Sequence, residues 1–212
     1  MFSFFKKKDA KASATPSIMG LRIGGSFEID PLLLRMNESE LMTDGAATSY
    51  IIKAVGTAEL DGTYVFRFYT DDDAFLQVIS EGNKQSESVV DVKLFHFYDT
   101  QDIVSQEIWD TLLNTKIGTP SYEVEGNIYQ RVWTSASDYH NPVYIQEDTY
   151  DEDGEVSSTD QFTMLFEREV SNGFTESLFL SAEESEQAGS LNRCFVLSTG
   201  ITLSPSQLTI HG

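Results

Sequence analysis

The stretch YIIKAVGTAELDGTYVFRFYTDDDAFLQVI, residues 50–79, predicts three β-strands joined by two acidic turns. Asp61-Gly62 separates the first two strand-like runs, and an Asp-Gly pair supplies the positive φ angles that a two-residue hairpin turn needs. Asp71–Asp73 forms the second turn. A meander of this kind has an apolar face that the rest of the chain must cover.

The middle strand of this meander separates an aromatic face from a mixed one. Successive side chains of a strand point to opposite faces of the sheet. One face therefore carries Tyr64, Phe66 and Phe68, and the other carries Val65, Arg67 and Tyr69. We expect later strands and a helix to cover the aromatic face.

Composition favours a sheet-rich domain. The chain has 212 residues, which suits one domain, and it contains 14 Phe, 9 Tyr and 2 Trp. Cys194 is the one cysteine, so neither an intrachain disulfide nor a cysteine-rich zinc site can form. Apolar runs all fall short of the roughly 20 residues that a membrane-spanning helix needs.

Two segments read as helices. Asp30-Pro31 offers an N-cap followed by a proline in the first turn, so a short helix is expected over Leu32–Met36. The clearest helix is Asp99–Asn114, where Val104, Ile108 and Leu112 line one stripe. We expect this second helix to lie on the apolar face of the sheet, with Trp109 in the contact.

The remaining apolar runs read as strands. They cover Gly20–Ile29, Ser88–Tyr98, Asn127–Thr134, Val143–Tyr150, Phe162–Val170, Phe174–Ser181, Cys194–Ser198 and Ile201–His211. His96 then lies within a bulky strand and is expected to be a hydrogen-bonded core residue. The predicted fold class is α+β: a predominantly antiparallel β-sheet with one main packed helix and short helical segments, in a single acidic domain over residues 18–212.

The formal charge of −20 limits the classes of partner. So acidic a surface repels phosphate backbones, and nucleic-acid binding is therefore not expected. A basic protein partner or a cation fits the charge better. The alternative is that the acidic side chains only keep the domain soluble.

The first 17 residues differ from all that follow. Four lysines and Asp9 give this segment +3, and since the whole chain carries −20, residues 18–212 carry −23. We expect a flexible tail that could rest on an anionic membrane surface through Phe2, Phe4, Phe5, Lys6, Lys7 and Lys8. The alternative is a disordered start that only aids solubility.

The segment TYDEDGEVSSTD, residues 149–160, is the sharpest local pattern. On a calcium-binding loop, Asp151 and Asp153 fall at ligand positions, Gly154 at the sharp turn and Asp160 at the last ligand position. Thr149 replaces the first acid of that pattern, and the flanks read as strands instead of helices. A metal site of Asp151, Asp153 and Asp160 competes with a plain hairpin loop, and calcium is the one cofactor that the sequence suggests.

Asp138, His140 and Tyr144 form a second candidate polar site. An Asp-His pair can act as a general base, but a hydrolase also needs a nucleophile and an oxyanion hole. The sequence has no GxSxG, HExxH or CxxC motif and no Walker loop. No catalytic residue is assigned; an enzyme stays open, and a non-enzymatic role is favoured.

The segments GLRIGGSFEID (20–30) and NPVYIQ (141–146), the meander between them and the FFKKK start (4–8) resemble the bacterial YjfK-like family of unknown function. The resemblance covers nearly the full chain. Members tend to be encoded near phage-shock-like, PspA-type proteins. The resemblance therefore implies a cytoplasmic accessory role in envelope or membrane homeostasis, and it supplies no catalytic residue.

Together these observations predict a non-enzymatic adaptor. Its acidic body would bind a basic protein partner, and its tail would make a weak contact with the cytoplasmic face of the membrane. The alternative is a domain that binds a small ligand or a divalent cation through residues 138–160.

Overall fold

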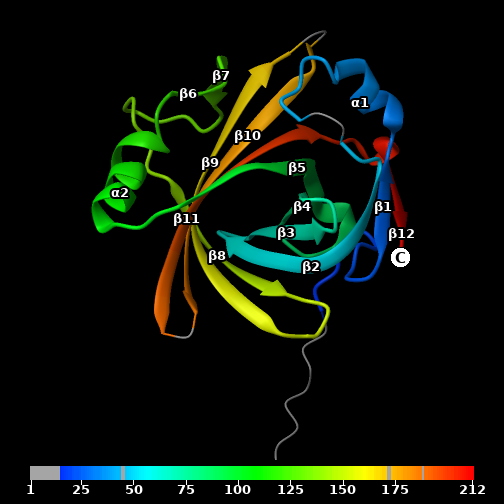
Figure 1. Cartoon of the computed structure of the whole chain (residues 1–212). Helices are drawn as coiled ribbons and strands as arrows, with labels where there is room; N and C mark the ends of the chain where they lie inside the picture. Colours follow the sequence, from blue (N-terminus) through cyan, green and yellow to red (C-terminus); the bar gives the residue numbers. More distant parts are fainter. Residues whose placement is uncertain (1–14, 44–45, 171–172, 188) are drawn as a thin grey trace, which may run out of the picture.

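The computed structural model describes residues 15–43, 46–170, 173–187 and 189–212. Twelve strands make one sheet (Figure 1). They are β1 (Ser26–Ile29), β2 (Ser49–Leu60), β3 (Thr63–Thr70), β4 (Ala74–Glu81), β5 (Val89–Asp102), β6 (Ser121–Val124), β7 (Asn127–Arg131), β8 (Val143–Tyr150), β9 (Val156–Glu169), β10 (Thr175–Gln187), β11 (Ser190–Thr202) and β12 (Leu208–His211). The helical segments are α1 (Pro31–Asn37), α2 (Gln106–Thr111), a π-helical turn (Leu112–Lys116) and two 3₁₀ turns (Ser86–Ser88 and Pro205–Gln207).

Eight of these strands close into a barrel. β2, β3, β4, β5, β11, β10, β9 and β8 pair antiparallel in that order, and β8 pairs back to β2. β1 and β12 extend the sheet from the first part of β2, and β7 and β6 extend it from the last part of β9. Closure leaves these barrel strands with few free edges, which is one way to avoid edge-to-edge association.

The mixed face of the meander points into the barrel. Arg67 of β3 reaches Glu147 of β8 and Gln161 of β9, and its guanidinium lies 4.9 Å from the ring centroid of Phe179 on β10. Side chains that contact one another across the interior of a barrel must face inward. The predicted separation of the two faces of β3 is therefore confirmed, with Arg67 inside the barrel.

The aromatic face points outward and is covered by the two ends of the chain. Phe66 and Phe68 are buried in a cluster with Leu76, Leu94 and Tyr50. Ile18, Leu21, β1, α1 and β12 supply the covering side chains on this side of the barrel. The predicted N-cap is confirmed, since the Asp30 side chain accepts a hydrogen bond from the Leu32 amide at 2.9 Å.

A second cluster covers the outer face of β9, β10 and β11. Trp109 and Leu112 pack there against Phe166, Leu180 and Phe195. In Figure 1 the α2 segment lies against the outside of the barrel, on the side away from α1. Trp109 is 4% exposed and is the packing anchor that the sequence predicted.

The predicted α+β class is wrong, because the protein is a closed antiparallel barrel and the expected main helix is short. Asp99–Asp102 belongs to β5, where its residues pair with β11 beyond a bulge at Leu197/Ser198. The helix begins only after Ser105, whose hydroxyl accepts a hydrogen bond from the Ile108 amide. Val104 of the predicted stripe is 85% exposed. Pairing of Asp99–Asp102 with β11 is therefore more favourable than the helix start that the capping pattern at Asp99 predicts.

Three strand boundaries also differ from the prediction. β9 begins at Val156 instead of Phe162, β10 ends at Gln187 instead of Ser181, and β11 begins at Ser190 instead of Cys194. The added residues are mostly polar on both faces, so alternation gives no signal there. Their pairing lengthens the β8–β9 and β10–β11 hairpins, which bound the cleft described below. No helix in the described ranges is long and apolar enough to cross a membrane.

Candidate functional site

A buried charge cluster fills the middle of the barrel. Arg67 is 3% exposed, and its guanidinium donates to the Glu147 carboxylate and to Gln161 Oε1 at 2.5 Å. Its Nε donates to Gln77 Oε1 at 3.1 Å. One side chain thereby joins β3 to β4, β8 and β9. Because these polar groups satisfy one another, the cluster braces the fold and is not the candidate ligand site.

The cluster also stabilises the contact between β2 and β8, which has the fewest ladder pairs of any two neighbouring barrel strands. The β2–β8 ladder has three residue pairs, Val55↔Tyr150, Gly56↔Thr149 and Thr57↔Asp148. Glu147 of β8 compensates: it binds Arg67 and accepts a hydrogen bond from Tyr69 Oη at 2.7 Å. Burial raises the pKa of Tyr69, so its phenol remains a neutral donor. We call this short joint the β2–β8 seam.

The candidate functional site is a cleft between two hairpins. It has a volume of about 550 Å³ and is lined by Val156, Ser157, Ser158, Thr159 and Asp160 of β9, Glu184, Ser185 and Glu186 of β10, and Leu191 of β11. In Figure 1 the β8–β9 hairpin (yellow) and the β10–β11 hairpin (orange) diverge toward the lower end of the view. We call this space the hairpin cleft. Its volume is in the usual range of about 300–1,000 Å³ for binding clefts.

The hairpin cleft is bounded by two strand edges. The β9–β10 ladder ends at the pair Asp160↔Glu184. Among the described residues, β9 beyond this pair runs on to Val156 paired only with β8, and β10 runs on to Gln187 paired only with β11. Each strand therefore presents backbone N–H and C=O groups toward the other hairpin, and such edges are templates for an added strand.

Acidic side chains dominate both hairpins. Those within residues 148–160 of the first hairpin are Asp148, Asp151, Glu152, Asp153, Glu155 and Asp160, and those within residues 183–187 of β10 are Glu183, Glu184 and Glu186. Arg193 neutralises Glu184 at 2.5 Å and lies over the Trp109 ring at 4.7 Å. Burial raises the pKa of Glu183. The hairpin cleft thus offers a negative field to a cationic ligand.

Half of the basic residues of the body make ion pairs. Of the ten Lys and Arg residues after Lys11, the five that do so form the pairs Lys53–Glu152, Arg67–Glu147, Lys93–Glu167, Arg168–Glu176 and Arg193–Glu184. Two of these pairs neutralise acids of the hairpins, Glu152 and Glu184. Asp160 and Glu186 make no ion pair among the described residues, so no neighbouring cation compensates their charge.

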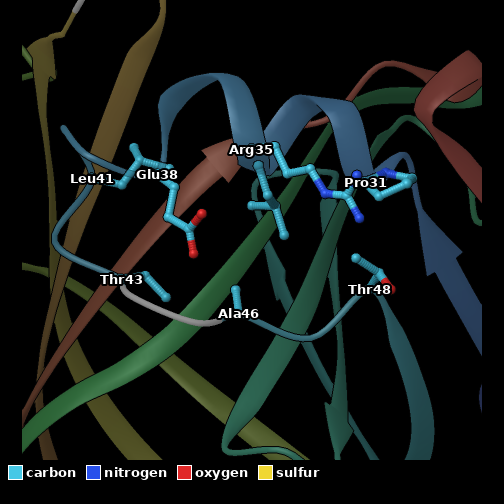
Figure 2. A pocket seen from close by; sticks show the side chains of 8 residues that line it. Pro31, Arg35, Glu38, Leu41, Thr43, Ala46 and Thr48 are labelled. Atoms are coloured by element: carbon cyan, nitrogen blue, oxygen red, sulfur yellow. The ribbon is translucent and has the colours of Figure 1, made fainter.

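A smaller pocket of about 230 Å³ lies beneath α1 (Figure 2). Figure 2 shows the Glu38 side chain directed into this space, whereas Arg35 runs along the helix toward Pro31. Both charges are exposed. Deeper, Leu34 and Thr43 also line a void of about 10 Å³ that touches His96 and Glu176. That void has room for about one water molecule, so a ligand larger than water cannot extend from the pocket to these two side chains.

Glu176 is a buried acid that no local sequence pattern singles out. It is 1% exposed and accepts hydrogen bonds from Tyr129 Oη at 2.7 Å, Arg168 Nε at 2.8 Å and the Met42 amide at 2.7 Å. These partners tie the loop after α1 to β7, β9 and β10. Its partners lie 8 to 134 residues away in sequence, so no local pattern could reveal it.

The predicted calcium ligands are divided between a turn and a strand. Asp151 Oδ1 accepts from the amides of Asp153 at 3.0 Å and Glu155 at 2.8 Å, which builds the turn at Gly154. Asp160 lies on β9 and accepts from Tyr144 Oη at 2.7 Å. Among the described residues no group of three or more His, Cys, Asp or Glu side chains could hold a metal ion. The calcium hypothesis gains no support and stays a prediction.

The predicted polar site of Asp138, His140 and Tyr144 is not assembled by hydrogen bonds in the described structure. Arg131 donates to the backbone carbonyl of Asp138 at 2.8 Å. His140 Nδ1 contacts the backbone carbonyl of the next residue at 2.5 Å, and Tyr144 donates to Asp160. The predicted membrane-surface residues, Phe2, Phe4, Phe5, Lys6, Lys7 and Lys8, lie outside the described residues.

Comparison with known proteins identifies the family. The model of the family described as "Protein of unknown function (DUF2491)" matches residues 1–209. The chain belongs to the DUF2491 family. It is similar to the uncharacterized protein YjfK of Escherichia coli (strain K12), with 28% identity over 219 residues that cover 100% of both chains. No solved structure matches the chain. The predicted YjfK-like family is thereby confirmed.

His96 of this DUF2491 protein is a core residue, as predicted. Tyr50 Oη donates to the Ala47 carbonyl at 2.6 Å and lies 3.0 Å from His96 Nε2, so the imidazole N–H donates to the phenol oxygen. Burial lowers the pKa of His96 from 6.5 to about 4. The half-buried ring is therefore neutral at pH 7 and packs beside Tyr50 of β2.

This buried imidazole should make the protein acid-sensitive. The unfolded chain binds a proton near pH 6.5 and the folded chain only near pH 4, so stability contributed by neutral His96 is complete above about pH 6.5 and falls as the pH drops toward 4. We expect His96→Gln to remove on the order of 2 kcal/mol of the loss between pH 7 and pH 5. Urea unfolding at both pH values measures it, and parallel pH profiles for the two proteins would contradict it.

Proposed function

We propose that this DUF2491 protein is a non-enzymatic adaptor that binds a basic, extended segment of a partner protein in the hairpin cleft. One observation carries the proposal: two strand edges without a ladder partner face each other across an acid-lined space of about 550 Å³. Strand addition to such an edge gives affinity through main-chain hydrogen bonds, and flanking side chains give specificity.

Electrostatics supports a basic ligand over a neutral or acidic one. Half of the Lys and Arg residues after Lys11 are in ion pairs, whereas Asp160 and Glu186, which line the cleft, make none among the described residues. Lysine or arginine side chains of an inserted strand would reach these carboxylates from either edge. Charge complementarity at an exposed rim mainly accelerates association and rejects wrong partners, and it weakens as salt is added.

The titratable groups with shifted pKa values also favour a binding role over catalysis. Burial is the main cause of the pKa shifts of His96, Tyr69 and Glu183, and His96 and Tyr69 are also held by hydrogen bonds to other side chains. The Cys194 thiol has its pKa raised to about 11 by burial, so little reactive thiolate forms at pH 7.

A basic peptide tests the adaptor proposal. We expect a synthetic peptide of alternating Lys and Val to shift the backbone amide signals of residues 156–159 and Ser185 in ¹⁵N-labelled protein. A Glu-Val peptide of equal length should not. Glu186→Lys should weaken binding on the order of fivefold, because an exposed ion pair contributes up to about 1 kcal/mol. Glu81→Lys, beside Thr63 on β3, is the matched control and should leave the affinity unchanged.

Two results would overturn the adaptor proposal. One is the absence of any shift with the Lys-Val peptide at low salt. The other is an equal loss of affinity in Glu186→Lys and Glu81→Lys, because this would mean that the peptide responds to net charge and not to the cleft.

The proposal includes a weak contact of the tail with the cytoplasmic face of the membrane. It is motivated by the charge contrast between residues 1–17, at +3, and residues 18–212, at −23. Each lysine near anionic lipid contributes about 1 kcal/mol. Full-length protein should float with anionic vesicles at low salt only, and a variant with Lys6, Lys7 and Lys8 replaced by Ser should not. Equal flotation of both proteins would exclude the tail as the anchor.

A further inference from the structure

We infer that the hairpin cleft has a resident ligand: the chain's own amino-terminal segment, residues 2–11. This inference rests on the proposed function, because it takes the cleft to be a site for an extended basic peptide. It adds the identity of one occupant and a consequence, namely that an external partner must displace the tail.

Charge is the first argument for this occupant. Lys6, Lys7, Lys8 and Lys11 with Asp9 give the segment +3, and it holds four of the 14 basic residues of the chain. The cleft presents Asp160, Glu184 and Glu186, of which Glu184 already binds Arg193. The most basic segment and an acid-lined cleft with little basic compensation thus belong to one molecule.

Apolar contacts give a second, independent argument. Val156 of β9 and Leu191 of β11 line the cleft and are 55% and 57% exposed. In an extended tail, Phe2 and Phe4 share a face with Lys6 and Lys8, while Phe5 shares the other face with Lys7. Each face of the tail therefore offers an aromatic ring to an exposed aliphatic side chain and a lysine to a carboxylate.

The length of the tail limits where residues 2–11 can dock within one molecule. Fourteen residues precede Thr15, where the described structure begins. With residues 2–11 docked, residues 12–14 link Lys11 to Thr15 and span at most about 13–14 Å. The docked segment must therefore end within this distance of Thr15, and tethering gives an effective concentration in the millimolar range.

The strand edges define how the tail would sit. β9 and β10 are antiparallel, so an inserted segment runs antiparallel to one edge and parallel to the other. Each added strand occupies about 4.8 Å in the hydrogen-bonding direction. The tail would continue the β9–β10 ladder beyond Asp160 and Glu184, filling the space between the diverging hairpins.

Spin labelling of the full chain locates the tail directly. A label on Ser3→Cys, with Cys194 replaced by Ala, should strongly broaden the amide signals of residues 157–159 and Ser185 at low salt. Signals near Gly62, at the β2–β3 turn, should remain sharp. In the control, one protein carries the spin label but no ¹⁵N, and it is mixed with ¹⁵N protein that carries no spin label. The broadening should then be lost, because docking is within one molecule. Broadening that persists in the mixture would overturn it in favour of a second copy.

A competition experiment needs no substitution in the folded body. The Lys-Val peptide should bind the variant with Lys6, Lys7 and Lys8 replaced by Ser about tenfold more tightly than the unmodified chain, because the tail competes at millimolar effective concentration. Equal affinities with no broadening would overturn the inference and leave the adaptor proposal intact. Broadening at the cleft without peptide binding by either protein would support the tail and contradict the adaptor role.

Discussion

Replacing Glu147 by Ala should destabilise the protein by about 3–5 kcal/mol, because it leaves the Arg67 guanidinium buried without its counter-ion. Arg67 is 3% exposed and Glu147 is 2% exposed, so solvent cannot compensate for the lost partner. Tyr69 would lose its acceptor as well. Guanidinium chloride unfolding at pH 7 measures the change in the free energy of unfolding.

The Lys53–Glu152 pair provides the matched control for Glu147. Its side chains are 46% and 51% exposed, and it also connects β2 with the β8–β9 hairpin. Glu152→Ala should therefore cost less than about 1 kcal/mol. A loss of similar size in both variants would contradict the assignment of Glu147 as the brace of the barrel. The double change Arg67→Met with Glu147→Leu should recover much of the stability, since no buried charge remains unpaired.

Substitution of Gly56 should have the second large effect. A Cβ atom at this position would lie 1.6 Å from Glu147 Oε1, well inside van der Waals contact, so the carboxylate would have to leave its place. We expect Gly56→Ala to cost about 2–4 kcal/mol, from crowding and from the disturbed hydrogen bonds of Glu147. Amide hydrogen exchange should accelerate at Val55–Thr57 and at Asp148–Tyr150, on the two sides of the seam.

A double-mutant cycle checks the cause of the Gly56 effect. In the Glu147→Ala background the carboxylate that meets the new methyl group is gone. Gly56→Ala should then cost much less than it does in the wild-type protein, and the two losses should be strongly non-additive. Additive losses would mean that the crowding involves something other than Glu147.

Local patterns were sufficient for the meander but not for the barrel. The Asp61-Gly62 turn, with φ angles of +50° and +81°, and the alternation along β3 are properties of adjacent residues, and both were predicted correctly. Closure depends on β8 pairing with β2 over about 90 residues of chain. Nothing in either strand signals the other, so an open sheet with a covering helix was the simpler prediction.

The same limit applies to the candidate site. Ser157–Asp160 is polar on both faces, and the calcium-loop pattern of residues 149–160 includes it because acids and a glycine have similar spacing in a calcium loop and in a hairpin turn. The strand exists because β8 supplies a full ladder on one side. The other edge of this strand lacks a partner because the β10–β11 hairpin diverges from it beyond Asp160↔Glu184. The periodicity of the sequence does not indicate this divergence.

The short β2–β8 seam has a thermodynamic consequence for binding. The β8–β9 hairpin is one wall of the cleft, and on its β2 side three ladder pairs and the ion pairs of Glu147 and Glu152 hold it among the described residues. Opening of the seam would swing this wall away from β10. A ligand that bridges β9 and β10 would therefore stabilise the closed seam. By linkage, a substitution that loosens the seam lowers the affinity of the cleft for its ligand, even where the substituted residue does not contact the cleft.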